Sequence, residues 1–156
     1  MLRAARLARR EGVTVEGSLE VGRGVRVELA RDARLSLGAG CVLGAGTRIL
    51  VRGGEVRIGA GTHVGEGCRI VAHTGVTIGA RCRIGPQAAI MDAEHEIGDP
   101  ETPIRAQGLR AAPVTIGDDA VLGPGAVVLA GAQVSAGALL GARTVTTGAM
   151  SPSGGV

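Results

Sequence analysis

Aromatic side chains are missing from this sequence: none of its 156 residues is Phe, Tyr or Trp. The hydrophobic 45% must therefore build a core from aliphatic and small side chains, each of which buries little area. Such a core needs many side chains stacked in a regular way, so we expect an internal repeat. The length corresponds to one domain.

Lysine is also absent, so all 17 basic residues are arginines, set against 14 acidic residues. The net charge of +3 and the pI near 9.3 favour an anionic partner. However, the arginines are scattered, and no aromatic side chains lie between them to stack on bases. We therefore expect no nucleic-acid partner.

Glycine, by contrast, is abundant at 28 residues. It follows no G-x-y triplet, which excludes a collagen-like chain, and aliphatic residues are too frequent for a disordered one. The uncharged run 120–142 is long enough to span a membrane as a helix. Gly125, Gly131 and Gly137 argue against that helix, so we expect no membrane span. Because no apolar signal segment follows Met1, we expect a cytoplasmic protein.

Aliphatic residues recur at a spacing of six through most of the chain. This spacing fits neither a helix nor a long strand, but it is typical of short strands separated by tight turns. Two positions before each of these residues stands another small or apolar side chain, which on a strand lies on the same face. The series is Val15, Val21, Val27, Leu37, Leu43, Ile49, Ile58, Val64, Ile70, Ile78, Ile84, Ile90, Ile116, Leu122, Val128, Val134, Leu140 and Thr146.

The interruptions divide this series into groups of three. Between groups the spacing becomes 10, 9, 8, 26 and 6, whereas within each group it stays at six. Three strands therefore form one coil, which predicts an all-β parallel β-helix of about six triangular coils, rising roughly 29 Å at ~4.8 Å per coil. All insertions follow a third strand, so we expect them to stack along one edge of the prism.

The longest insertion, 91–113, contains five acidic residues and His95 near its start. A loop of this length inside a compact repeat is usually functional or disordered. The register of the insertions places His73 at the corner one coil before the root of this loop. We therefore expect His73 to lie within reach of Asp92 and Glu94.

The Ile-Gly hexapeptides, the interrupting loop with a histidine, and the segment 112–119 followed by uninterrupted hexapeptides resemble the hexapeptide-repeat acetyltransferases. Within them the chain is most similar to the maltose, galactoside and colanic-acid O-acetyltransferases, from about Leu37 to Val156. The resemblance implies a left-handed β-helix and a homotrimer. It also implies acetyl transfer from acetyl-CoA, bound between neighbouring prisms, to a hydroxyl of a saccharide or related small molecule.

The resemblance further implies roles for single residues. His95 would be the general base, since an imidazole can deprotonate an attacking hydroxyl near neutral pH. Asp92, Glu94 or Glu96 would orient its other ring nitrogen. His73 would help form the acceptor side of the site, in contact with Asp92 and Glu94 or with the bound hydroxyl. The expected contacts to acetyl-CoA come from the last coils: Val121, Pro124, Ala142 and Thr147.

Two other functions stay open. The family usually has Trp where Val121 stands and Lys where Gly148 stands, so the chain could be a non-catalytic trimeric scaffold. A zinc enzyme of the γ-carbonic-anhydrase kind shares the β-helix and uses three histidines, but the His-x4-His spacing is absent here. We expect no metal.

The remaining chemically distinctive residues have structural interpretations. Cys41, Cys68 and Cys82 all stand at the small inward position, which predicts buried reduced thiols. His63 stands at an outward position, exposed or at a subunit interface. The arginine-rich segment 1–12 is expected to be a basic arm or a short helix that caps the first coil, ahead of the β-helix at 13–156.

Overall fold

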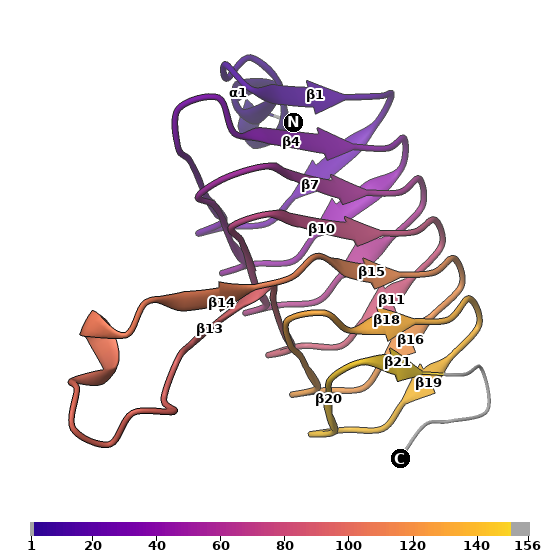
Figure 1. Cartoon of the computed structure of the whole chain (residues 1–156). Coiled ribbons are helices and arrows are strands. Elements are labelled where there is room, and N and C mark those ends of the chain that lie inside the picture. The colour runs from indigo at the N-terminus through magenta and orange to yellow at the C-terminus, as the bar shows by residue number, and fades with distance from the viewer. Residues whose placement is uncertain (1, 151–156) are drawn as a thin grey trace.

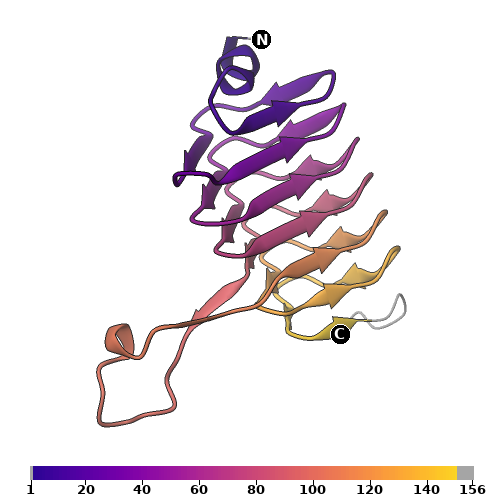
Figure 2. The ribbon, with the colours of Figure 1, turned by 45° about the horizontal axis from the view of Figure 1, so that its top comes forward.

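Short strands that each end at a sharp corner wind this chain into a prism of stacked coils (Figure 1). The computed structural model describes residues 2–150. The chain begins in helix α1 (Leu2–Ala8) at one end of the prism, and successive coils follow toward the other end. A single arm leaves the prism between the fourth and fifth coils, at the segment 92–113 (Figure 2).

Three parallel sheets form the three faces of the prism, which we call faces A, B and C. Face A contains β1 (Val13–Val15), β4 (Arg34–Leu37), β7 (Glu55–Ile58), β10 (Gly75–Ile78), β15 (Val114–Ile116), β18 (Gln133–Val134) and β21 (Ala149–Met150). Face B contains β2 (Leu19–Val21), β5 (Cys41–Leu43), β8 (His63–Val64), β11 (Arg83–Ile84), β16 (Val121–Leu122) and β19 (Leu139–Leu140). Face C contains β3 (Arg26–Leu29), β6 (Arg48–Val51), β9 (Arg69–Ala72), β12 (Ala89–Met91), β17 (Val127–Val128) and β20 (Val145–Thr146).

The core is a set of columns in which equivalent residues of successive coils lie next to each other. On face A, Ile58 pairs with Ile78, which pairs with Ile116. From Leu35 to Thr146, every residue that the hexapeptide register predicts to face inward is at most 3% exposed, except Thr144 in the last coil, which is half-buried. The predicted solenoid of six coils with three strands each is therefore confirmed, and β21 adds the start of a further turn.

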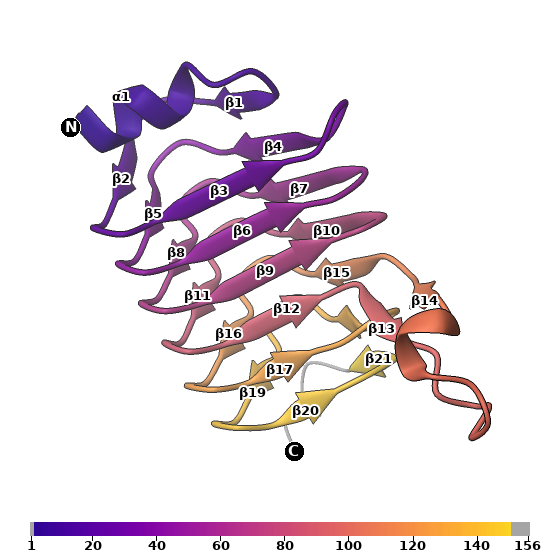
Figure 3. The ribbon, with the colours of Figure 1, turned by 90° about the vertical axis from the view of Figure 1, so that its left-hand side faces the viewer.

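The first coil is less well buried than the others, because no coil lies above it. Its inward residues Val21 and Val25 are only half-buried. Helix α1 lies across this open end, where it contacts β1 and β2 and buries Leu7 (Figure 3). The segment 1–12 thus contains a short helix over the first coil.

The glycines after the inward residues are needed for close approach between coils. Their φ values are negative, and the positive φ values occur at other glycines of the corners. At Gly38, a Cβ atom would lie 2.4 Å from the backbone nitrogen of Ala60 in the next coil. At Gly117, it would lie 2.4 Å from the backbone nitrogen of Ala136. These positions exclude any side chain, because backbone atoms cannot move aside within a continuous ladder of strands.

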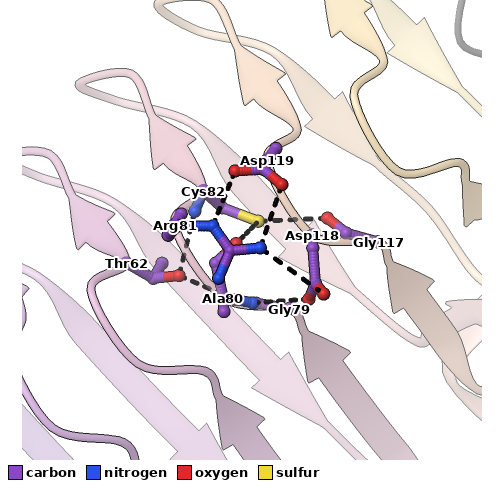
Figure 4. Close-up of polar contacts among 8 residues, drawn as sticks. All are labelled: Thr62, Gly79, Ala80, Arg81, Cys82, Gly117, Asp118 and Asp119. Carbon is purple, nitrogen blue, oxygen red and sulfur yellow. Dashed lines mark hydrogen bonds and ion pairs between the residues drawn. The ribbon is translucent and has the colours of Figure 1, made fainter.

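The small inward residues are often hydrogen-bond donors to the next coil. The hydroxyl of Thr62 donates to the carbonyl oxygen of Gly79 at 2.7 Å and accepts from the backbone N–H of Cys82 at 3.1 Å (Figure 4). The thiol of Cys82 donates to the carbonyl oxygen of Gly117 at 3.1 Å. Thr and Cys at this position therefore satisfy carbonyl groups at the corners, in addition to filling space.

The cysteines are buried and unbridged, as predicted. Burial raises the pKa of all three thiols, which disfavours the reactive thiolate. Cys41 and Cys68 also donate to glycine carbonyls of the next coil, each at 3.1 Å.

A charged cluster lies outside the same corner as Thr62 and Cys82. The guanidinium of Arg81 forms two hydrogen bonds with the carboxylate of Asp119, at 2.9 and 3.0 Å (Figure 4). The carboxylate of Asp118 accepts the backbone N–H of Ala80 at 2.8 Å. Hydrogen bonding to Arg81 lowers the pKa of Asp119. This exposed cluster links the fourth and fifth coils on either side of the chain insertion.

Among residues 2–150, no helix is long and apolar enough to cross a membrane.

Candidate active site

The insertion 91–113 forms an arm that projects away from the prism (Figures 1 and 2). The arm begins as a two-stranded antiparallel ribbon of β13 (Ala93–His95) and β14 (Leu109–Ala111). A short 3-10 helix, η1 (Ile104–Ala106), lies between the strands near the tip. The sequence predicted a long loop at this place, but not the pairing that makes it a ribbon.

Asp92 fixes the root of the arm to the preceding corner of the prism. Its carboxylate is 0% exposed and accepts the backbone N–H groups of His73, Thr74 and Gly75, each at 2.7 Å. The hydroxyl of Thr74 adds a fourth hydrogen bond at 3.0 Å. On the other side, the carbonyl oxygen of Asp92 accepts the N–H of Ala112, which closes the base of the arm.

His73 lies against Asp92, on the edge that the insertion register predicted. Its Nδ1 atom is 3.7 Å from Asp92 Oδ1 and makes no hydrogen bond within the described part of the chain. The imidazole ring remains about one-third exposed. Stacking of the corners along one edge is seen again at Gly54, where a Cβ atom would lie 1.9 Å from the carbonyl oxygen of Thr74. A role of His73 in acceptor binding stays a prediction.

His95 stands at the end of β13, opposite Leu109, and is exposed. Its side chain forms no hydrogen bond or ion pair with the residues described between 2 and 150. The neighbouring Glu94 instead bonds to Arg110 across the ribbon at 2.7 Å, which raises the pKa of Arg110. The carboxylates of Asp92 and Glu94 therefore hold the arm in this chain, and neither contacts the imidazole of His95.

The four residues expected to contact acetyl-CoA lie on the outside of the last two coils. Pro124 and Ala142 occupy the same corner of successive coils, since the carbonyl oxygen of Pro124 accepts the N–H of Arg143. Val121 precedes this corner on face B and is 37% exposed. Thr147 is exposed after β20, at the following corner. The structure thus brings Val121, Pro124 and Ala142 together, while Thr147 lies one strand further along the coil.

Two other exposed apolar residues of the last coil were not singled out by the sequence reasoning. Leu139 is 58% exposed next to Val121 on face B, and Val145 is 61% exposed on face C. The arm likewise exposes Ile97, Ile104 and Leu109. The available signal was the presence of Val and Leu at outward positions of the last hexapeptides, where earlier coils have His63 and Arg83.

In the described residues of a single chain, no group of three or more His, Cys, Asp or Glu side chains could hold a metal ion.

The chain is similar in structure to several hexapeptide-repeat enzymes. One is a hexapeptide-repeat acetyltransferase from Vibrio cholerae O1 biovar eltor in complex with acetyl coenzyme A, with a TM-score of 0.69 and 19% identity. The match covers 97% of this chain and 68% of that one. Another is a maltose O-acetyltransferase from Clostridium difficile 630, with a TM-score of 0.66 and 19% identity, covering 96% of this chain and 66% of that one.

A third similar structure is the N-acyltransferase AntD from Bacillus cereus, in a complex with dTDP and coenzyme A. Its TM-score is 0.60 at 14% identity, covering 86% of this chain and 77% of that one. No protein-family model and no curated protein sequence matches the chain. These structures therefore establish that the chain has the fold of the hexapeptide-repeat acetyltransferases. It spans about two thirds of the length of the first two.

Proposed function

We propose that this chain is a cytoplasmic, homotrimeric O-acetyltransferase that moves an acetyl group from acetyl-CoA to a hydroxyl of a saccharide or related small molecule. The observation that carries the proposal is the position of His95. It is an exposed, unpaired imidazole on an arm that leaves the prism one coil before the surface of Val121 and Pro124. The fold supports it, since one structure of the same fold holds acetyl coenzyme A.

His95 can serve as a general base because its imidazole has no hydrogen-bond or ion-pair partner among residues 2–150. A ring nitrogen of His95 takes the proton of the acceptor hydroxyl while the oxygen attacks the thioester carbonyl carbon. The carbon–sulfur bond then breaks, and the leaving sulfur of coenzyme A takes the proton from the imidazolium. The ester of the acceptor and free coenzyme A are the products. His73, at the root of the arm, belongs to the acceptor side of this site, and the buried carboxylate of Asp92 holds the corner that carries it.

Apolar surface on the last coils supports both the acyl-donor site and the trimer. Val121 and Leu139 lie side by side on face B, and Val145 lies on face C of the last coil; each is at least 37% exposed. Neighbouring exposed apolar side chains such as Val121 and Leu139 are typical of interaction surfaces. In the trimer, a neighbouring prism covers part of this surface, and the rest packs against the pantetheine arm of acetyl-CoA at Pro124, Ala142 and Thr147. In a cyclic trimer each contact joins two different surfaces of neighbouring copies, and every copy buries both.

The arm also has exposed apolar side chains that a neighbouring chain of the trimer would cover. Ile97, Ile104 and Leu109 are 46–70% exposed on a ribbon that projects away from its own prism. In the trimer these side chains pack against a neighbour and bring His95 to a cleft between two chains. A sedimentation mass of three times the 15.5 kDa chain is therefore expected at micromolar concentration. A mass of one chain would contradict this arrangement.

The central experiment measures release of the coenzyme A thiol from acetyl-CoA with a panel of mono- and disaccharides. We expect His95→Ala to lower turnover at least about a hundredfold, since removal of a general base costs about 10²–10⁴ in rate. The melting temperature should not change, because His95 lies on the arm and outside the core. His63→Ala is the matched control: it removes another exposed histidine, on β8, and should leave turnover within about twofold.

Two outcomes separate the alternatives. Thiol release that is the same in wild type and His95→Ala would remove His95 from the mechanism. No thiol release by the wild-type trimer with any acceptor would favour the non-catalytic scaffold. For His73→Ala we expect a larger rise in the KM for the acceptor than in the KM for acetyl-CoA, because a binding contact is lost while the base remains. If both KM values of His73→Ala equal those of the wild type while its melting temperature is lower, His73 has only a structural role.

A further inference from the structure

A cavity of about 740 Å³ lies between helix α1 and the first coil, at the end of the prism opposite the proposed acyl-donor surface. Its walls combine two kinds of side chain. Leu7, Val21 and Val25 are apolar lining residues, and Arg3, Arg6 and Arg10 are charged lining residues whose side chains are exposed. The residues of the proposed transfer reaction do not line it, so the proposed function leaves this cavity unexplained.

The apolar part of the cavity follows from the end of the repeat. In every later coil, the neighbour above covers the inward side chains, but the first coil has only α1 above it. The helix has seven residues and buries one leucine, Leu7, so it covers the end of the prism only in part. Val21 and Val25 consequently stay half-buried, where their equivalents in the next coil, Leu43 and Thr47, are 0% exposed. The apolar wall of the cavity is thus the part of the first coil that α1 leaves uncovered.

The charges of the cavity are all of one sign. Arg10 donates a hydrogen bond to the carbonyl oxygen of Val27, but Arg3 and Arg6 form no hydrogen bond or ion pair with any residue between 2 and 150. No acidic side chain lines the cavity. Guanidinium groups beside apolar surface bind anions more strongly than they do in open water, because the local dielectric constant is lower.

We propose that this cavity binds an anionic amphiphile: one carboxylate or sulfonate head group on an apolar body the size of a medium acyl chain or two aromatic rings. The head group would lie at Arg3 and Arg6, and the apolar body would cover Val21 and Val25. The volume is in the range of about 300–1,000 Å³ that is usual for small-molecule sites. Occupancy would complete the cover of the first coil, so the ligand should also stabilise the fold.

The test uses two probes that differ only in charge. 1-Anilinonaphthalene-8-sulfonate carries a sulfonate, whereas N-phenyl-1-naphthylamine has the same rings without it. We expect saturable binding of the sulfonate at one site per chain, displaced by decanoate. Arg3→Gln/Arg6→Gln should weaken binding of the sulfonate at least about tenfold and change binding of the neutral probe less than about twofold.

The control variant Arg9→Gln/Arg52→Gln removes two other exposed arginines, so it makes the same change in net charge outside the cavity. It should bind both probes like the wild type. A second variant, Val25→Gln, places an amide in the apolar wall and should weaken both probes. Decanoate should raise the melting temperature of the wild type, and raise it less in Arg3→Gln/Arg6→Gln.

Three results would overturn the proposal. The first is binding of the sulfonate that is unchanged in Arg3→Gln/Arg6→Gln. The second is failure of decanoate to displace the probe. The third is association with anionic phospholipid vesicles in the absence of any binding of monomeric decanoate, which would make the arginines a membrane-contact surface. None of these depends on acetyl transfer, so the proposed function and this proposal can fail independently.

Discussion

Replacement of Asp92 tests how the arm is attached to the prism. The carboxylate is fully buried and accepts four hydrogen bonds, three of them from successive backbone N–H groups. Asp92→Ala leaves those three donors unpaired, at about 1–3 kcal/mol each if none is rescued. Water can enter beside His73, which is about one-third exposed, and satisfy part of these donors, so we expect the free energy of unfolding to fall by about 3–5 kcal/mol in total. For a chain of this length that corresponds to a melting temperature roughly 6–20 °C lower.

Asp92→Asn retains the shape of the side chain and separates two contributions. Its oxygen can occupy the place of Oδ2 and keep the hydrogen bonds from Thr74 and Gly75. Its amide group then faces the N–H of His73, so one donor opposes another. We expect a loss of about 1–3 kcal/mol, smaller than that of the alanine variant. Asp118→Ala is the matched control, because its carboxylate also accepts a backbone N–H of the preceding coil but is exposed; it should cost less than about 1 kcal/mol.

Thermal unfolding followed by circular dichroism measures the total effect, and amide hydrogen exchange locates it. The amides of His73, Thr74 and Gly75 should exchange faster in Asp92→Ala, while that of Gly79, which donates to Ile116 inside the sheet, should remain protected. An alanine variant that melts within about 2 °C of the wild type and keeps the three amides protected would refute this account of the arm.

Further predictions concern the corners. At Gly54, φ is +68° and a Cβ atom would lie 1.9 Å from a backbone oxygen, whereas a Cβ atom at Gly137, where φ is +74°, would have no atom within 4 Å. Gly137→Ala should lower the free energy of unfolding, measured in urea, by about 1 kcal/mol. Gly54→Ala should lower it by about 2–3 kcal/mol more than Gly137→Ala does. Arg81 lowers the pKa of Asp119, so this pair contributes stability above the ordinary carboxyl pKa and loses it as pH falls through the lowered one. The urea midpoint of Arg81→Gln should therefore fall further below the wild type at about pH 7 than at about pH 2.5. The three cysteine thiols should react with Ellman's reagent only in urea, since burial raises their pKa; fast reaction of the folded protein would contradict this.

The sequence was sufficient for the repeat and its register because both depend on local geometry. A strand places alternate residues on one face, so the spacing of six and the smaller residue two positions earlier identified the core from Leu35 onward. The changes in spacing identified the corner where insertions stack. They consequently placed His73 next to Asp92, a contact between residues far apart in the chain.

The tertiary structure decided whatever depends on the partners of a residue. Composition gave the loop five acids, but only the folded arm shows that Asp92 caps a turn of the preceding coil and that Glu94 bonds to Arg110. The local sequence around an acidic residue is the same whether its carboxylate pairs with a backbone N–H, an arginine or water. The partner depends on which segments the solenoid places next to that residue. The reason for glycine after the inward residues likewise appears only in the structure, because the short distance to the next coil excludes a Cβ atom there.

The first coil illustrates both sides of this division. Its hexapeptides have the same pattern as the others, so the sequence predicts the same burial for Val21 and Val25. In the structure these residues stay half-buried beside a cavity, because a solenoid buries a coil only when another lies above it and α1 is too short to replace one. Periodicity specifies which side chains face inward, but the completeness of their burial depends on neighbours that only the assembled prism supplies.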